Sequence, residues 1–130
     1  MTTASTLERD LTLRSAAARL DELRMRSALA SLDDDASPVS PAECLEALAL
    51  SEVLIRKAIH GRQLDVRAAR RAGASWTQVG ASVGMSKQAA WEAHDRWING
   101  QAELHRTSDL EGLDRPEEQA ARDIAGGPED

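Results

Sequence analysis

Side chains that could carry out catalysis or bind a metal ion are few and widely separated in this chain of 130 residues. The three histidines, His60, His94 and His105, and the one cysteine, Cys44, share no metal-ligand spacing. The chain has no His-x-x-x-His pair, no paired cysteines and no glycine-rich phosphate loop. We therefore expect no enzyme activity, no metal site and no cofactor.

The polar residues Ser86, Lys87 and Gln88 are suited to a role other than catalysis, which is hydrogen bonding to nucleotide bases. Serine favours the N-cap position, so Lys87 and Gln88 stand in the first turn of a predicted helix. A glutamine pairs with adenine through two hydrogen bonds, and a lysine reaches guanine or a phosphate. The start of such a helix fits the major groove of DNA.

A shorter helix is predicted directly before this one. Ser75 and Gln78 have the spacing of a capping box, which starts a helix of about two turns. Trp76, Val79 and Val83 fall on one face of that helix and should be buried. This face is expected to pack against the following helix.

Two glycines shape the predicted connection between the helices. Gly80 is small where the next helix must cross closely, and Gly84 fits a tight turn that needs a positive φ. Met85 should point inward from the turn. The second helix is expected to bury one stripe of side chains, made of Ala90, Ala93 and Trp97. Residues 75–97 therefore read as helix, short turn and helix.

The run from Gly73 to Ala90, GASWTQVGASVGMSKQAA, resembles the helix-turn-helix of bacterial transcription factors, particularly region-four-like domains of sigma factors and related small regulators. The resemblance covers residues 62–98. It implies a tri-helical DNA-binding domain with the second motif helix in the major groove. By position, this resemblance assigns the contact with DNA to four residues, Ser86, Lys87, Gln88 and Ala89. Glu92 and Asp95 depart from the family pattern, which often has Arg or Lys there.

Further candidate DNA contacts flank these four residues. Trp91 could lie against a thymine methyl group or a sugar, although we favour packing on Val83 or the N-terminal helix. Thr77 and Gln78, at the start of the first motif helix, could bind a phosphate through side chains and free amides. Four arginines are candidate phosphate contacts: Arg67, Arg70, Arg71 and Arg96.

Charge is unevenly distributed along the chain, whose net charge is −6. Residues 51–100 have a balance of +4, whereas residues 1–50 have −4 and residues 101–130 have −6. Positive charge is therefore concentrated where the motif lies, and local potential governs the attraction of phosphate. Leu, Ile and Val supply only 24 residues and Phe and Tyr are absent, so we expect a small core.

The N-terminal segment is predicted to form one helix from Ser5 to Leu32, started by a capping box of Ser5 and Glu8. Residues at alternating steps of three and four make an apolar stripe on it: Leu13, Ala16, Leu20, Leu23, Ser27 and Ala30. This stripe either packs on the rest of the domain or forms a dimer seam. Residues 33–40, rich in Asp and containing Pro38, read as a linker.

A long central helix is predicted after the linker, capped by Ser40 and Glu43 and ending near Ala72. A break at Gly61 is an alternative. Gly73 is placed to end the helix. From residue 100 onward the chain is acidic and reads as a flexible tail, with a short helix over 114–125 as the alternative.

These observations predict an all-α protein with an N-terminal helix (1–32), a linker (33–40), a helix-turn-helix domain (41–99) and a disordered acidic tail (100–130). The leading hypothesis is a cytoplasmic transcriptional regulator that binds double-stranded DNA, with a homodimer through residues 5–32. The alternative is a protein-binding adaptor without catalytic activity, antitoxin-like or directed at a sigma factor, whose acidic tail holds a partner. We predict no signal peptide and no membrane segment.

Overall fold

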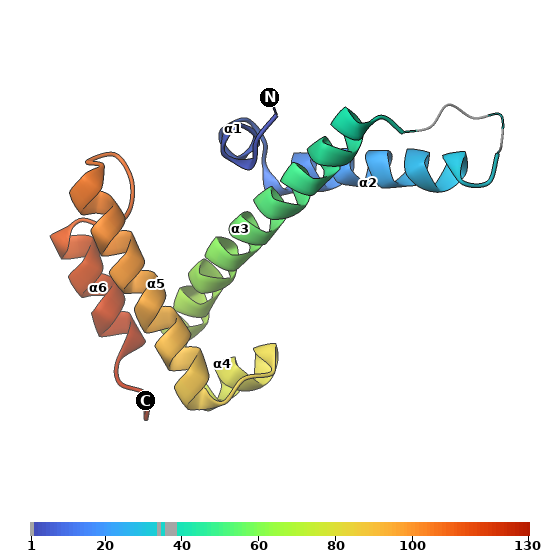
Figure 1. Cartoon of the computed structure of the whole chain (residues 1–130). Helices are drawn as coiled ribbons and strands as arrows, with labels where there is room; N and C mark the ends of the chain where they lie inside the picture. The colour runs from blue at the N-terminus through green and yellow to red at the C-terminus, as the bar shows by residue number, and fades with distance from the viewer. Residues whose placement is uncertain (1, 34, 36–38) are drawn as a thin grey trace. The chain divides into compact units, whose positions relative to one another are not determined.

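The computed structural model describes residues 2–33, 35 and 39–130, and these residues form helices and no strand (Figure 1). The prediction of an all-α fold is confirmed. Most of the predicted linker, residues 34 and 36–38, lies outside the described residues. The helices of the described part are α1 (Ala4–Asp10), α2 (Leu13–Ala30), α3 (Pro41–Arg71), α4 (Trp76–Val83), α5 (Lys87–Thr107) and α6 (Arg115–Ala125).

The chain divides into two compact units, residues 1–61 and residues 62–130, and α3 contributes to both. The sequence placed its boundaries at residues 33–40 and at residue 100 instead. The observed division follows the two cores, because the first part of α3 packs against α1 and α2 and its last part packs against α4 and the helices after it.

In the first unit, the predicted single helix from Ser5 to Leu32 is wrong, because two helices occupy this segment. Thr12 is extended and forms a capping box with Ser15, so a new helix begins there. The predicted capping box of Ser5 and Glu8 is also wrong. The N-cap of α1 is Thr3, whose hydroxyl accepts a hydrogen bond from the Thr6 amide.

The centre of the predicted α2 stripe is buried within the same chain. Ala16, Leu20 and Leu23 form a core cluster with Leu50 and Val53 of α3. Leu13 and Ser27, near the two ends of the stripe, are exposed. Of the two interpretations left open by the sequence, packing on the rest of the domain is therefore the one observed for these three residues.

Ion pairs fix how α2 lies along α3. Arg19 donates to both carboxylate oxygens of Glu46, from Nε at 3.1 Å and from Nη2 at 2.8 Å. Arg26 pairs with Glu43 at 2.6 Å, seven residues further along α2 and three residues back along α3. The hydrogen bonds from Arg19 lower the pKa of Glu46 and raise that of Arg19. The two pairs hold α2 and α3 in an antiparallel arrangement.

The central helix α3 closely follows its prediction. Ser40 accepts a hydrogen bond from the Glu43 amide at its start, and the helix continues through Gly61 without a break. It ends at Arg71, and Gly73 adopts a φ of +103°. The Ala74 amide bonds the Ala69 carbonyl at 3.0 Å, which is the closing bond of a Schellman motif.

The second unit is built around Trp76 and Ile98, both buried. Val66 of α3, Val79 of α4 and Ala90 of α5 surround them. The buried stripe of α5 was predicted as Ala90, Ala93 and Trp97, but the fully buried residues are Ala90, His94, Ile98 and Ala102. The stripe differs because α6, a helix that the sequence offered only as an alternative, packs on the side of α5 that carries Ile98.

Residues 100–130 do not form the predicted flexible tail. Helix α5 continues to Thr107, and α6 runs beside it in the opposite direction (Figure 1). Asp114 and Glu117 form the capping box that the alternative prediction placed there. Two alanines of α6, Ala121 and Ala125, are buried in the core of this unit. Small side chains let the two helices approach closely, so an acidic helix packs with little apolar surface.

His94 is a fully buried polar residue at the centre of this core. Its Nδ1 lies 2.9 Å from the Gln63 side-chain oxygen, and its ring stacks on Trp97 and meets Trp76 at a tilt. No described residue pairs with its Nε2. Burial, reinforced by the positive charge of Arg67, lowers the pKa of His94 to about 4. The folded unit therefore holds a neutral imidazole at pH 7.

This burial predicts an acid-sensitive second unit. Below about pH 6.5 the unfolded chain protonates at His94, while the folded chain stays neutral until the pH nears 4. The free energy of unfolding should therefore fall as the pH drops from 7 to 4, by about 3 kcal/mol from this residue alone. Urea unfolding followed by tryptophan fluorescence measures it, because all three tryptophans lie in this unit.

The test variant is His94→Gln. Its matched control is His105→Gln, because His105 lies on the same helix but outside the core. The first substitution should remove most of this pH dependence, although it lowers stability at pH 7. The second should leave the pH dependence in place. An equal slope in the wild type and in His94→Gln would contradict the assignment.

Candidate nucleic-acid interface

Helices α4 and α5 are both started by side-chain caps that the sequence predicts. The backbone amide of Gln78 donates to the Ser75 hydroxyl at 3.1 Å, and the side-chain oxygen of Gln78 accepts from the backbone amide of Ser75 at 2.9 Å. At the start of α5, the Ser86 hydroxyl accepts from the Ala89 amide at 3.1 Å. These caps fix where each helix begins, and they leave only Gly84, Met85 and Ser86 between them.

Gly84 has the role expected of it, whereas Gly80 makes room for the backbone of the turn rather than for the next helix. Gly84 ends α4 with φ +72° and ψ +30°, a left-handed conformation that other residues adopt at a cost. A Cβ on Gly80 would lie 2.6 Å from the Met85 carbonyl oxygen and 2.9 Å from that of Ser86. The close neighbour of Gly80 is thus the backbone of the turn. Met85 packs on the core, as predicted.

The first turn of α5 is exposed, but acidic side chains hold its polar groups. Lys87 Nζ lies 2.6 Å from the Glu129 carboxylate, and 44% of the Lys87 side chain remains exposed. The Gln88 amide donates to Glu92 at 3.0 Å, within the same helix. Ser86 and Gln88 are exposed and Ala89 is half-buried. The four residues assigned by the resemblance therefore lie together at an accessible helix start.

Trp91 packs against the end of the chain, where neither interpretation of the sequence placed it. It is half-buried against the core of the second unit, and its Nε1 donates to the Gly126 carbonyl at 2.9 Å. Val83, one of the two expected partners, is not part of the cluster against which Trp91 packs. Residues 126–130, which include Glu129, therefore lie beside the first turns of α5.

The four candidate arginines fall into two groups. Arg70 donates to the Ala74 carbonyl at 2.7 Å and to the Ala125 carbonyl at 3.2 Å, and its guanidinium lies 5.0 Å from the Trp76 ring centroid. Arg67 lies over Trp97. Both are half-buried. By contrast, Arg71 and Arg96 are exposed, as are Thr77 and Gln78 at the start of α4.

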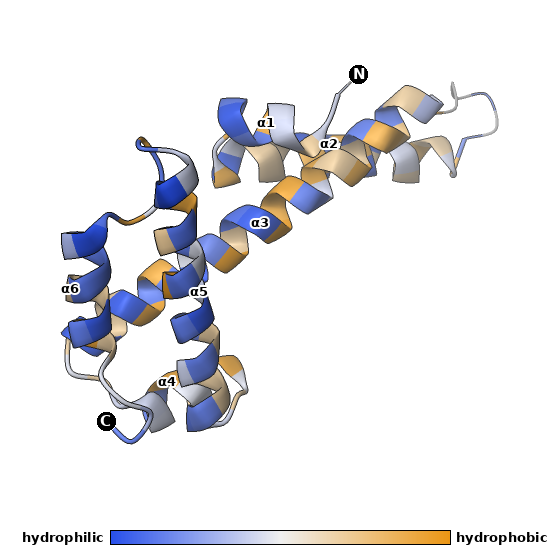
Figure 2. Cartoon of the chain, turned by 60° about the vertical axis from the view of Figure 1, so that its left-hand side comes forward, coloured by the Kyte–Doolittle hydropathy of each residue, from blue (hydrophilic) through white to orange (hydrophobic). Residues whose placement is uncertain are grey.

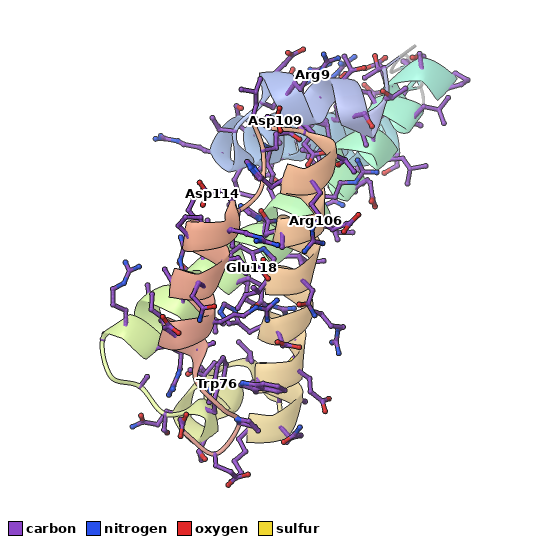
Figure 3. The ribbon with its side chains drawn as sticks, turned by 90° about the vertical axis from the view of Figure 1, so that its left-hand side faces the viewer. Arg9, Trp76, Arg106, Asp109, Asp114 and Glu118 are labelled. Atoms are coloured by element: carbon purple, nitrogen blue, oxygen red, sulfur yellow. The ribbon has the colours of Figure 1, made fainter. Side chains whose placement is uncertain are left out.

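A hydrogen-bonded network centred on Arg122 of α6 was not predicted from the sequence. This guanidinium donates to Asp95 at 3.3 Å, to Asn99 at 2.6 Å and to Glu118 at 2.8 Å. Figure 3 shows Glu118 on the side of α6 that faces α5. The spacing of Glu118 and Arg122, four residues apart on a helix, was the signal available in the sequence. The network occupies Asp95, one of the two acidic residues at which the sequence departs from the family pattern.

The outer face of α5 is left to solvent between α4 and α6. It carries Gln88, Glu92 and Arg96 among its exposed residues, and Figure 2 shows that α6 and the visible side of α5 are mainly hydrophilic. This face is mixed in charge, so the arrangement favours specific hydrogen bonding over strong general attraction of phosphate.

Comparison with protein families, with curated proteins and with solved structures finds no match to this chain. Among the described residues, no helix is long and apolar enough to span a membrane. The same residues contain no group of three or more histidine, cysteine, aspartate or glutamate side chains suited to a metal ion.

Gly80 supplies a stability test of this turn. We expect Gly80→Ala to lower the free energy of unfolding of the second unit by about 2 kcal/mol or more, because backbone oxygens cannot move aside for the new methyl group. The measurement is urea unfolding by tryptophan fluorescence.

Gly61→Ala is the matched control. A Cβ there meets nothing within 4 Å, so the variant should gain about 1 kcal/mol of helix propensity in α3. If Gly80→Ala were as stable as the wild type, the close passage at the turn would not exist.

Proposed function

We propose that this protein binds double-stranded DNA through a helix-turn-helix formed by α4 and α5, and acts as a transcriptional regulator. The observation that carries the proposal is the accessible, capped start of α5, held at a fixed angle to α4 by the turn at Gly80 and Gly84. A capped helix start of this kind enters the major groove in proteins with this motif. The resemblance of residues 62–98 to sigma-factor region-four-like domains supports the same function, at work in the bacterial cytoplasm.

Each exposed residue has a defined part in the proposed complex. Gln88 and Lys87 read base edges, once they exchange their present carboxylate partners for DNA. Thr77 and Gln78, at the start of α4, contact a phosphate together with Arg71 and Arg96. Arg70 and Arg67 act indirectly, since their guanidinium groups support Trp76 and Trp97 in the core.

A protein-binding adaptor is the second candidate, and the acidic segment over residues 101–130 favours it. This segment holds nine acidic and three basic side chains, and it comprises the end of α5, the connection to α6, α6 itself and the residues after it. An acidic segment built on packed helices suits a basic partner protein, such as a sigma factor or a toxin. The two functions differ in salt dependence, because DNA binding weakens steeply as salt concentration rises.

The direct test is the double variant Lys87→Ala with Gln88→Ala. We expect it to lose sequence selectivity on duplexes chosen from a random library by the wild type, since both proposed base contacts are gone. Gel-shift titration at several salt concentrations measures affinity and the salt slope together.

The control is Arg115→Ala with Gln119→Ala, which removes one positive charge and one amide from exposed positions on α6. It should bind the selected duplexes like the wild type. Unchanged selectivity in the Lys87 and Gln88 variant would exclude α5 from the interface. Absence of any bound duplex at low salt would favour the adaptor.

Glu129 gives a second test, because its carboxylate pairs with Lys87, the lysine that we propose reads a base. Glu129→Gln should raise DNA affinity several-fold at low salt, by freeing Lys87 and removing a negative charge near the phosphates. Glu103→Gln is the control, since Glu103 forms an equally exposed pair with Arg106 near the other end of α5. Equal affinities for the two variants would show that Glu129 does not compete with DNA.

A further inference from the structure

We propose that the outer face of α3 in the first unit pairs with the same face of a second copy of this chain, in antiparallel orientation. Four large apolar residues line this face: Leu45, Leu48, Ile55 and Ile59. They are 59%, 67%, 54% and 50% exposed, respectively. We call this row the α3 stripe. The proposal is independent of DNA binding.

The α3 stripe lies on the side of the helix away from α2. Leu48 precedes the buried Leu50 by two residues, and Ile55 follows the buried Val53 by two. Two residues correspond to about 200° around a helix, so Leu48 and Ile55 are nearly opposite these core residues. The steps from Leu45 through Leu48 to Ile55 and Ile59 match positions a and d of a heptad, with Glu52 at the intervening place. Such a row is a seam for another helix.

The distribution of exposed apolar residues also points to association. Eight of the twelve large exposed hydrophobic residues of the described chain belong to the first unit. Its own buried core has only five members: Ala16, Leu20, Leu23, Leu50 and Val53. The α3 stripe is about 21 Å long, enough for two heptads of contact. An exposed apolar row of this kind, interrupted at Glu52, marks an interface.

Charge along α3 selects a second, antiparallel copy as the partner. Up to Glu52 every charged residue of this helix is acidic, and from Arg56 to Arg62 every one is basic. Antiparallel pairing that places Leu48 against Ile59 of the second copy also places Glu52 beside Arg56 of that copy. The twofold axis repeats both contacts. Parallel pairing would instead set like charges against each other.

The groups needed for this pairing are accessible. Within one chain, Arg56 pairs with Glu52 at 3.0 Å and with Glu8 of α1 at 3.2 Å. The side chains of Glu52 and Arg56 are still 49% and 43% exposed, so each can also face a second copy. The predicted dimer seam in residues 5–32 is different, because its central residues, Leu20 and Leu23, are already covered by α3. The α3 stripe takes over the role that the sequence gave to that seam.

Sedimentation equilibrium of the full chain tests the pairing. The wild type should sediment as a dimer, with twice the 14.1 kDa mass of one chain. Leu48→Lys with Ile59→Lys should sediment as a monomer, because it places four lysines in one seam. Circular dichroism must show that its helix content is unchanged.

The control variant is Met25→Lys with Leu29→Lys, which charges two equally exposed residues on the outer face of α2. It should remain a dimer. A monomeric wild type, or a stripe variant that dimerises as well as the control, would overturn the proposal. If the α2 variant alone became monomeric, the dimer surface would lie on α2 and the proposal would fail.

Orientation is tested with a short bismaleimide cross-linker. In the proposed pair the two Cys44 residues lie about 28 Å apart along the helix axes, so the wild type should not be cross-linked. Ile55→Cys in a Cys44→Ala background places the two thiols one turn apart or less, so it should give a covalent dimer. Cross-linking of the wild type through Cys44 would show a parallel pair, in which residues of the same number lie side by side, and would overturn the antiparallel assignment.

Discussion

The second unit depends on one carbonyl group, that of Ala125. The Trp76 indole donates to it at 2.9 Å from inside the core, and Arg70 donates to it at 3.2 Å. One oxygen thus joins the end of α3, the start of α4 and the end of α6. A buried carbonyl and a buried indole N–H both need partners, so the arrangement satisfies each group while it fixes three helices. Figure 3 shows Trp76 lying against α5, the remaining helix of this unit.

The position of the chain after Ala125 follows from this bond. Because α6 ends at the core, residues 126–130 run past the start of α5, where Gly126 receives the Trp91 indole and Glu129 pairs with Lys87. An acidic segment therefore lies beside the residues that we assign to base reading. In the complex with DNA that we propose, the phosphates compete with the protein's own carboxylates.

The two units differ in the kinds of side chain that form their buried cores. The second has three tryptophans and a stacked, neutral histidine, so it closes a core despite the shortage of large aliphatic residues. The first has a core of alanine, leucine and valine, held in register by the Arg19–Glu46 and Arg26–Glu43 pairs. It leaves a second apolar row of α3 exposed. We assign that row to a second copy because α3 is acidic first and basic afterwards.

Local signals in the sequence determined the helix starts at Ser40, Ser75 and Ser86, the continuity of α3 and the turn at Gly84. These features depend on residues within four or five positions of each other, so composition and spacing are sufficient. Tertiary structure alone decided the buried face of α5, the partner of Trp91 and the packing of α6 on α5. Each of these depends on residues far apart in the chain, such as Trp76 and Ala125, whose contact no local pattern encodes. Helix α6 in particular reads as a solvated acidic segment, and only its packing on α5 makes it part of the core.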